Sequence, residues 1–592
     1  MQTYTAPLRD MRFVLHELHD FEGLCALPAF RDLDAATVDS VLEEAGKLAT
    51  EVLLPLNAPG DAEGCRLENG VVRTPAGFPE AYRQFRENGW TALAEDPEYG
   101  GQGLPESVSK LVEEIICAAN LSFSLYPGLT HGAVQALADH GTEALKAQYL
   151  PKMISGEWSG AMCLTEAHCG TDLGLLRTRA TPADDGSYRL DGAKIFISAG
   201  DHDLTDNVVH LVLARMPGAP AGIKGVSMFL VPKFLPEGNA RNGVICTGLE
   251  HKMGLKASAT CQISFEDAQG WLVGAPNKGM QAMFTMMNAE RLGVGIQGNG
   301  ITEAAYQSSV AYARDRLQGR SLNGAARPDL PADPIIVHPD VRRMLMTMRV
   351  SSEGCRAVGV WVARAMDIAA HGEDADERQA ADDFVALMTP VVKALFTDLG
   401  FEAASLGVQV YGGHGYIREH GVEQYVRDAR IAMLYEGTNG IQALDLVGRK
   451  LPAHMGRYMR RFFHPVAEMI AQAKQDSRTT RLAEPLERAF GALQLTTAQI
   501  ATTALKDAEE AGAAATDYLR MLGLVAMGAM FVRSAGIAHA RLAENTPDAP
   551  FYRAKLASAQ FFVDRILPQA TALFLAIKAG KHSTMALEDA AF

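Results

Sequence analysis

A block of short strand-like segments between two long helical blocks is the feature that most constrains the fold of this chain. Residues from about 159 to 275 carry short runs rich in β-branched and aromatic residues, and Gly, Asp and Pro separate these runs. On either side, apolar residues recur at helical spacing. Because helices and strands are segregated and do not alternate, this order predicts an α+β fold and not a doubly wound parallel sheet.

The same changes of pattern predict five segments in the 592 residues. They are an N-terminal extension, a helical domain, a β-domain, a second helical block and an additional helical domain, over residues 1–45, 46–158, 159–275, 276–450 and 451–592. Within the extension, we expect one helix that begins near Ala35 and runs to about Leu48.

Charge and cysteine content exclude some functions. The chain has 55 basic and 70 acidic residues and a formal net charge of −15, which argues against nucleic acid as the main partner because phosphate binding needs a basic surface. The eight cysteines form no C-x-x-C pair and no Cys/His cluster at metal spacing. We therefore expect no metal site, and we expect the reduced thiols of a cytoplasmic protein.

Other sequence signals are missing from the chain. The first residues lack the apolar stretch of a secretory signal. The longest uncharged apolar run, Met521 to Val532, has 12 residues, too few to span a bilayer, so it predicts a buried helix and no transmembrane segment. No G-x-G-x-x-G follows a strand, which leaves a Rossmann-type nucleotide site without support.

A single carboxylate, Glu436, lies in an otherwise apolar and small-residue run from Ala432 to Gln442. Partial desolvation in such a run raises the pKa of a carboxylate toward values at which it can act as a base near neutrality. Glu436 is therefore our candidate catalytic base. The alternative is a helix-start Glu that caps its own backbone, with the adjacent glycines forming a turn.

Two further segments combine hydroxyl groups with a glycine or an aromatic residue and are candidate ligand-binding segments. Thr165 and Thr171 supply hydroxyls, and Gly170 lets the backbone approach a ligand closely; the alternative is a Thr-rich turn that enters a strand. About 25 residues later, a strand-like run contains Phe196 and Ser198. The alternative for that run is an ordinary amphipathic strand with Phe196 in the core.

Cationic and amide side chains follow in the second helical block. Asn288 and Arg291 lie one helical turn apart on the same face; the alternative is a solvated helix face. Downstream, Arg316 and Gln318 form an Arg-x-Gln pattern. A guanidinium can fork onto phosphate oxygens.

Paired glycines mark a further candidate site. Gly412 and Gly413 follow Gln409 and precede His414. Because glycines allow a ligand to approach the backbone closely, this segment is typical of a binding loop. We interpret His414 as a supporting residue and not as a catalytic one.

These motifs resemble those of the acyl-CoA dehydrogenases in order and spacing, over about residues 46 to 450. The family patterns are Y-E-G-T-x-x-I-Q at Glu436, T-E-P-x-x-G-S-D at Thr165, G-x-K-x-W-I-T/S at Phe196, R-x-Q-F-G at Arg316 and Q-x-x-G-G-x-G at Gln409. The two ends of the chain further resemble a bacterial subgroup of similar length that has a C-terminal helical extension.

The chain departs from the family patterns at several positions. Ala167 replaces the usual Pro, His168 replaces a small residue and Thr171 replaces Ser. Phe196 stands where Trp is commoner, and no Phe separates Gln318 from the following glycine. Thr for Ser keeps the hydroxyl, whereas the missing Phe weakens the residue match at Arg316.

The resemblance implies a fold and a set of partners. The implied fold has a helical N-terminal domain, a central β-barrel-like domain and a C-terminal four-helix bundle, to which this chain adds an extra C-terminal helical domain. The implied cofactor is FAD, and the implied partners are an acyl-CoA substrate and an electron-transfer flavoprotein as electron acceptor. The covering C-terminal helices favour a homodimer over a tetramer.

The resemblance also implies residue roles. Glu436 would remove the α-proton of the acyl thioester while the β-hydride passes to the flavin, which yields a trans-2-enoyl-CoA. The implied substrate contacts are Asn288, Arg291 and Gly437. The implied cofactor contacts are Leu164, Thr165, Gly170, Thr171, Phe196, Ser198, Arg316, Gln318, Gln409, Gly412, Gly413 and Thr438.

Several alternatives remain open at this level. The acyl group could be 3-methylmercaptopropionyl, which would give methylthioacryloyl-CoA, or a short-, medium- or long-chain fatty acyl group. Three methionines could line a pocket for a thioether or fill the core: Met283, Met286 and Met287. An acyl-CoA oxidase, a flavin-bearing DNA-binding relative and a flavin scaffold without turnover are the competing functions. Glu290 is the alternative position for the base.

Overall fold

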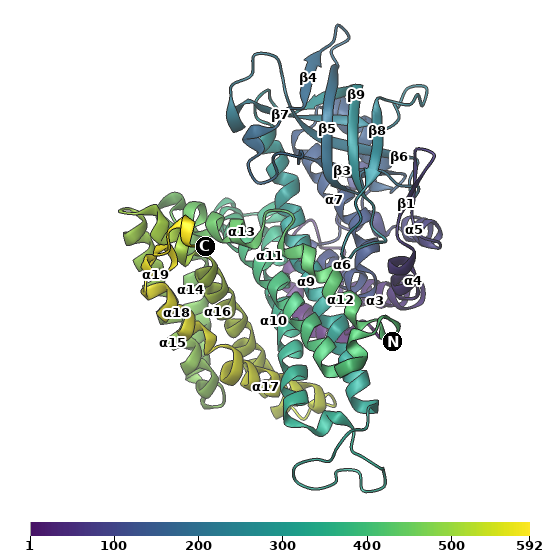
Figure 1. Ribbon diagram of the computed structural model, residues 1–592. Coiled ribbons are helices and arrows are strands. Elements are labelled where there is room, and N and C mark those ends of the chain that lie inside the picture. The colour runs from purple at the N-terminus through teal and green to yellow at the C-terminus, as the bar shows by residue number, and fades with distance from the viewer. Residues whose placement is uncertain (1) are drawn as a thin grey trace. The chain divides into compact units, whose positions relative to one another are not determined.

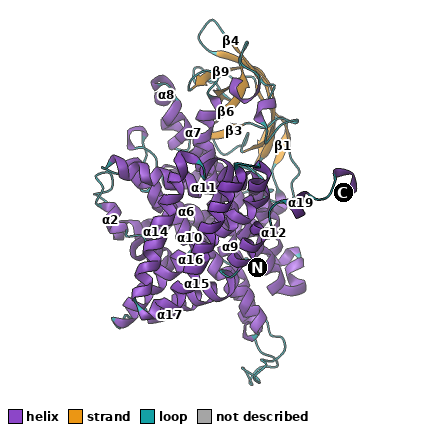
Figure 2. Cartoon of the chain, turned by 90° about the vertical axis from the view of Figure 1, so that its left-hand side faces the viewer, coloured by secondary structure: helices purple, strands orange, loops and turns teal. Residues whose placement is uncertain are grey.

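The computed structural model describes residues 2–592 and divides into two compact units. We call Lys47–Leu104 together with Ala119–Gly293 the mixed unit. We call Met1–Gly46, Pro105–Ala118 and Val294–Phe592 together the helical unit. Every strand of the described residues belongs to the mixed unit. Figure 2 shows the strands in orange.

Seven strands of the mixed unit form one sheet (Figure 1). They are β3 (Trp158–Cys163), β4 (Arg179–Pro182), β5 (Tyr188–Ser198), β6 (Asn207–Arg215), β7 (Val226–Pro232), β8 (Val244–Leu249) and β9 (Thr260–Val273). β3 pairs with β6 in parallel, whereas β5 and β7 pair with β9 in antiparallel register. The predicted strand-rich region is therefore confirmed as a sheet, with a buried core that includes Val212, Phe229 and Ile263.

The predicted barrel-like closure is wrong. The strand order is β3-β6-β4-β5-β9-β7, β6 also pairs with β7, and β8 adds to β9 beside this path. Among residues 2–592, β3 pairs only with β6 and β8 only with β9, so each keeps an unpaired edge. Alternating apolar residues occur in open sheets and in barrels alike, so the sequence pattern did not determine closure.

Helices accompany the sheet in the mixed unit. They are α4 (Leu54–Glu63), α5 (Phe78–Glu87), α7 (Leu121–His140) and α8 (Glu143–Ile154), together with a small hairpin of β1 (Arg66–Glu68) and β2 (Val71–Arg73). α7 packs against β3. Gly160 makes this approach possible, because a Cβ at that position would lie 2.5 Å from the Cβ of Ala133.

Long helices build the helical unit (Figure 1). α9 (Gly279–Asp315) begins in the mixed unit and ends in the helical unit, where α10 (Pro339–His371) packs along α11 (Ala375–Tyr411) and the shorter α12 (Val422–Ala429) packs on α11. Residues 276–450 and 451–592 are thus helical, and from Val294 to Phe592 they belong to the one helical unit. The additional domain contains α14 (Arg457–Gln475), α15 (Ser477–Ala504), α16 (Ala508–Ala543), α17 (Ala549–Phe561), α18 (Gln569–Lys578) and α19 (His582–Met585).

The apolar run from Met521 to Val532 lies inside α16, which packs against α15, α17 and α18. Two helical segments, Ala375–Tyr416 and Ala508–Ala543, are long and apolar enough to cross a membrane by length and composition alone. In the most apolar stretch of each, 78% and 83% of the residues are buried inside the protein. Such burial is typical of core helices, in agreement with the predicted buried helix.

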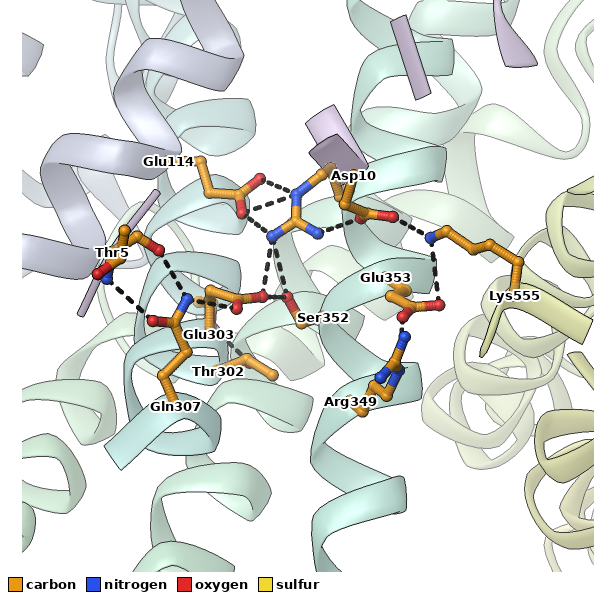
Figure 3. Close-up of polar contacts among 12 residues, drawn as sticks. Thr5, Asp10, Glu114, Thr302, Glu303, Gln307, Arg349, Ser352, Glu353 and Lys555 are labelled. Carbon is orange, nitrogen blue, oxygen red and sulfur yellow. Dashed lines mark hydrogen bonds and ion pairs between the residues drawn. The ribbon is translucent and has the colours of Figure 1, made fainter. Parts of the chain in front are cut away.

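The N-terminal extension contains more helix than predicted. The expected helix is confirmed as α3 (Ala35–Leu48), and α1 (Leu8–Arg12), a π-helical turn over Phe13–Leu18 and α2 (Phe21–Cys25) precede it. Asp10 of α1 belongs to a buried polar network with α6 (Glu106–Ala119), α9, α10 and α17 (Figure 3). Apolar side chains of the same segment, including Met11, Leu15 and Leu18, are buried as well, so apolar packing and the polar network both hold it.

Candidate active site

The segment that carries Glu436 is a strained turn in the helical unit. It follows a 3₁₀ turn at Arg430–Met433 and precedes α13 (Asn439–Asp445). Glu436 has φ +56° and Gly437 has φ +85°, so two successive residues adopt the left-handed conformation. A non-glycine residue there is uncommon and is retained where the surroundings hold it. The Glu436 side chain is half-buried.

Hydrogen bonds fix this turn on both sides of Glu436. The Nε2 of Gln442, a fully buried side chain, donates to the carbonyl oxygens of Glu436 and Gly437 at 3.0 and 3.4 Å. The hydroxyl of Tyr435 donates to Oε1 of Gln297 on α9. Glu436 does not cap a helix, because the N-cap of α13 is Thr438, whose hydroxyl accepts the amide of Ile441 at 3.3 Å. The capping alternative is therefore wrong for Glu436.

A second group of predicted residues surrounds a surface cavity of about 370 Å³ in the helical unit. Its lining residues are Tyr312, Arg316, Gln318, Ile335, Val410, Tyr411, Gly412, Gly413 and His414. The structure thus brings Arg316 and Gln318, at the end of α9, to the glycine pair at the end of α11. Gln409 is exposed on α11 but is not among the lining residues.

Aromatic residues that the sequence did not single out shape this cavity. The rings of Tyr312 and Tyr411 stack with centroids 4.0 Å apart. The hydroxyl of Tyr312 lies 2.9 Å from Nδ1 of His414, which supports the interpretation of His414 as a positioning residue. A Cβ on Gly412 or Gly413 would meet no atom of the chain within 4 Å, so the backbone there is open to a ligand. Spacing could not reveal the two tyrosines, since they lie on different helices.

The Thr165 segment follows β3 in the mixed unit and contacts β5. The amide of Ile195 donates to the carbonyl of Thr165 at 2.9 Å, and the buried Nζ of Lys194 donates to the carbonyl of Leu164 at 3.0 Å. Lys194 also pairs with Glu166 at 2.9 Å. Burial opposes ionisation of Glu166, but Lys194 and hydrogen bonds from the backbone and hydroxyl of a neighbouring threonine lower its pKa to about 2.

The other candidate residues of the Thr165 loop and of β5 are at least partly exposed. Gly170 and Thr171 are exposed, and Ser198 at the end of β5 is half-buried. Phe196 is 60% exposed with φ +59°, at an irregularity in the β5–β9 pairing between Lys194 and Ile197. The core-strand alternative for Phe196 is therefore wrong, because its ring projects away from the core. An exposed aromatic ring held in a strained conformation is suited to cover a planar ligand.

One cluster that the cysteine pattern did not predict lies in the same loop. Candidate ligand atoms of Glu166, His168 and Cys169 lie within 4.8 Å of one another. The Glu166 carboxylate is already engaged by Lys194 and by backbone amides, including the amide of Arg177 at 2.7 Å. The cluster is therefore built as an ion-pair and hydrogen-bond network, and its oxygens are committed to protein donors.

The predicted substrate contacts Asn288 and Arg291 lie on the part of α9 that belongs to the mixed unit. Nη1 of Arg291 donates to Oδ1 of Asn288 at 3.4 Å, and the guanidinium lies 5.9 Å from the ring centroid of Phe284. Arg291 is only 7% exposed, so the solvated-face alternative is wrong for this residue. Glu290 is equally buried and faces α7, since its Oε1 would lie 2.7 Å from a Cβ on Gly132.

Comparison with protein-family models gives four consecutive matches. The acyl-CoA dehydrogenase N-terminal domain matches residues 41–157, the middle domain residues 161–268 and the C-terminal domain residues 277–451. A model described as acetyl-CoA dehydrogenase C-terminal like matches residues 462–588. The matched regions together cover most of the chain and include all the candidate residues described above.

Comparison with individual proteins points the same way. A 3-methylmercaptopropionyl-CoA dehydrogenase of Ruegeria pomeroyi is 44% identical over 96% of this chain and 97% of its own length. A butyryl-CoA dehydrogenase of Syntrophomonas wolfei is 32% identical over 100% of this chain and 99% of its own. Among solved structures, Caenorhabditis elegans ACDH-11 in complex with C11-CoA aligns with a TM-score of 0.79 at 20% identity, over 95% of this chain and 91% of that one. An acyl-CoA dehydrogenase of Bacillus anthracis complexed with FAD aligns with a TM-score of 0.73 at 20% identity, over 96% and 91%.

Proposed function

This chain belongs to the acyl-CoA dehydrogenase family, and we propose that it oxidises an acyl-CoA thioester to the trans-2-enoyl-CoA with Glu436 as the base. The observation that carries this proposal is the geometry of the Glu436 turn. Glu436 is half-buried and has a left-handed backbone conformation, and the turn around it is held by a hydrogen bond from Tyr435 to α9 and by one from Gln442 of α13 to the Glu436 carbonyl. Such strain is retained where a side chain must be aimed at a reacting atom.

The cofactor of this family is FAD, and the residues present fit it. The cavity beside Arg316 offers a guanidinium, an amide, open glycine backbone and stacked tyrosine rings, a donor set that suits a pyrophosphate and an adenine. In the mixed unit, Phe196 offers an exposed ring and Ser198 a hydroxyl for a planar ring system. When bound, FAD supplies the acceptor for the hydride.

A residue of this chain, Glu436, is the proposed acceptor of the substrate's α-proton. In the proposed reaction, the Glu436 carboxylate takes the proton from the α-carbon, and the electron pair of that bond forms the new double bond as the hydride leaves the β-carbon. The isosteric Gln at this position would keep the shape and lose the base. General-base catalysis contributes roughly 10²–10⁴-fold to rates, so Glu436→Gln should retain FAD and ligand binding and lose nearly all turnover.

For the substrate, we propose 3-methylmercaptopropionyl-CoA, with methylthioacryloyl-CoA as product. The support is the 44% identity to a dehydrogenase named for that thioester. The methionines at the start of α9 add a chemical reason, because thioether side chains are polarisable and adapt to an irregular or sulfur-bearing acyl chain. Met286 is fully buried beside α7, where its Cγ would lie 3.1 Å from a Cβ on Gly132.

The second candidate substrate class is linear saturated fatty acyl-CoA. The butyryl-CoA dehydrogenase described above supports it, and so does a broad-specificity linear acyl-CoA dehydrogenase of Mycobacterium tuberculosis that is 34% identical over 100% of both chains. A DNA-binding function has little support, because the net charge of −15 is unfavourable for phosphate contacts.

We further propose an electron-transfer flavoprotein as electron acceptor, a homodimer as the assembly and the cytoplasm as the compartment. The family motif at Gly412 and Gly413 supports the dimer, since in the family it holds the adenosine half of FAD from a neighbouring subunit. All eight cysteines are free, and six of them are buried, which supports a reducing compartment. Light scattering of the purified protein measures the assembly directly.

The test of the proposed function is anaerobic bleaching of the visible flavin band by four thioesters in parallel. They are butyryl-, octanoyl-, palmitoyl- and 3-methylmercaptopropionyl-CoA. We expect fast bleaching by 3-methylmercaptopropionyl-CoA, and bleaching by another thioester alone would move the substrate to that class. Glu436→Gln should bind the same thioester without bleaching, and Glu290→Gln is the matched control for the alternative base. Full turnover in Glu436→Gln would contradict the assignment of the base.

A further inference from the structure

Lys393, in the middle of α11, is a fully buried lysine that points at the Glu436 turn. Its Nζ donates to the carbonyl oxygen of Gly437 at 2.8 Å and to Oδ1 of Asn439 at 2.9 Å. Lysine is almost never fully buried unless its charge is paired, because desolvation of the ammonium is costly. A buried lysine at this position therefore depends on its hydrogen-bond acceptors, and one of them is the carbonyl of Gly437, the residue next to the proposed base.

Asn439 connects this ammonium to two further groups of α11. Its Nδ2 donates to Oδ1 of Asp398 at 2.8 Å and to Oγ1 of Thr397 at 3.0 Å. Burial raises the pKa of Asp398, while the hydrogen bond from Asn439 and the charge of Lys393 act in the opposite direction. Lys393, Asn439 and Asp398 thus form one continuous polar chain that fastens the first residue of α13 to α11.

The backbone of the turn requires such a fastening. Glu436 and Gly437 both have positive φ, and a left-handed conformation is strained at a non-glycine residue such as Glu436. Lys393 holds the Gly437 carbonyl from α11, whereas Gln442 holds the Glu436 and Gly437 carbonyls from α13. Donors from two different helices therefore hold the Gly437 carbonyl, and Gln442 holds the Glu436 carbonyl as well.

We propose that Lys393 is a positioning residue for Glu436: its buried ammonium holds the Glu436–Gly437 turn in the conformation that aims the carboxylate at the α-carbon of the acyl-CoA. Lys393 touches neither substrate nor cofactor in this role and acts through the backbone of the turn. The inference rests on the proposed function, because the base that it positions is the one proposed above.

The experiment compares two substitutions of Lys393 in the full-length, FAD-loaded protein. Lys393→Met keeps the length of the side chain and removes both donor and charge, whereas Lys393→Gln keeps an N–H donor and removes the charge. Asp383→Asn is the control for destabilisation, because Asp383 is a buried residue of the same helix that pairs with Arg457 of α14, far along α11 from the turn. FAD content and thermal midpoint are measured for all three.

The informative readouts are kcat, KM and the isotope effect with an α-deuterated thioester. A displacement of about 1 Å costs about 100-fold in rate, so Lys393→Met should lower kcat per bound FAD by about that factor with little change in KM. The isotope effect on flavin bleaching should rise, because proton abstraction becomes slower relative to the other steps. Lys393→Gln should fall between Lys393→Met and the wild type, since it keeps one hydrogen bond to the turn.

The outcomes separate this inference from the proposed function. A wild-type protein that no thioester bleaches, or a Glu436→Gln variant with full turnover, overturns the proposed function and this inference with it. An active wild type, an inactive Glu436→Gln and a Lys393→Met with unchanged kcat per bound FAD overturn the inference alone. Equal losses of kcat per bound FAD in Lys393→Met and Asp383→Asn would also overturn it, since they would reflect general destabilisation. If Lys393→Met does not fold, Lys393→Gln decides by the same criteria.

Discussion

Removal of the Arg356 guanidinium should destabilise the helical unit strongly, because Arg356 forms buried ion pairs with Asp10, Glu114 and Glu303, which Figure 3 labels. Its side chain is 1% exposed. The guanidinium donates to Glu114 of α6 at 3.0 and 3.2 Å, to Asp10 of α1 at 2.5 Å and to Glu303 of α9 at 2.9 Å. Four helices therefore meet at one cation, and Arg356→Met leaves three carboxylates around an apolar side chain.

The expected magnitude follows from the cost of uncompensated buried charge. Removing one partner of a buried ion pair costs about 3–5 kcal/mol, compared with about 0–1 kcal/mol for an exposed pair. Lys555 of α17 still faces Asp10 and so offsets part of the loss on that side. Among the described residues, Arg356 is the one cation that forms an ion pair with Glu114. Burial raises the pKa of Glu114 even beside Arg356. We therefore expect Arg356→Met to cost about 3–5 kcal/mol.

The assay is thermal or denaturant unfolding together with limited proteolysis of the N-terminal segment. The matched control is Arg343→Met, on the same helix, because Arg343 forms an exposed pair with Asp340. Glu114→Gln introduced into Arg356→Met should recover part of the stability, since it removes a buried charge that has lost its partner. The reasoning fails if Arg356→Met and Arg343→Met unfold at the same midpoint, or if Glu114→Gln lowers the stability of Arg356→Met further.

Three further results are expected. Burial raises the pKa of Asp367 to about 7, so the folded state binds this proton more tightly than the unfolded state. The free energy of unfolding should therefore fall as pH rises from about 4 to 7. In melts over this range, Asp367→Asn should reduce the pH dependence of stability, while its side-chain oxygen can still accept the amide of Ser107 at the start of α6. Gly437→Ala, at φ +85°, should cost about 1 kcal/mol or more in stability and lower kcat, measured by melting and flavin bleaching. Phe196→Ala should leave the melting temperature of the apoprotein nearly unchanged, because the ring is exposed, but should weaken FAD binding in a titration.

Local features of the site were predictable from the sequence. Glu436, the Gly412–Gly413 pair and the Arg316 segment are each contained in a few consecutive residues, and local patterns determine turns and ligand-binding loops. The structure places Arg316, Gln318 and the glycine pair around one cavity. Helix and strand content was predictable for the same reason, since periodicity is a local property.

Features that depend on distant residues were not predictable. Closure of the sheet depends on which edges pair, so the barrel-like prediction failed although the strands were recognised. Burial of Arg291 depends on the elements that pack around α9, which the local sequence around Asn288 and Arg291 does not reveal. Lys393 lies 43 residues before Glu436, the difference between the two positions, and no spacing rule connects a helix residue to a carbonyl in a turn so far along the chain.

The position of Lys393 gives α11 a role in both candidate regions of the helical unit. The helix holds the Glu436 turn at its middle and ends at Gly412, beside the cavity lined by Arg316. At 1.5 Å per residue, the 19 positions from Lys393 to Gly412 span about 28 Å of one continuous helix. A rigid helix of this length fixes the proposed base and the cavity relative to each other without a direct contact between them. A substitution that bends α11 between the two points should therefore weaken both cofactor binding and proton abstraction, whereas Lys393→Met should affect proton abstraction alone.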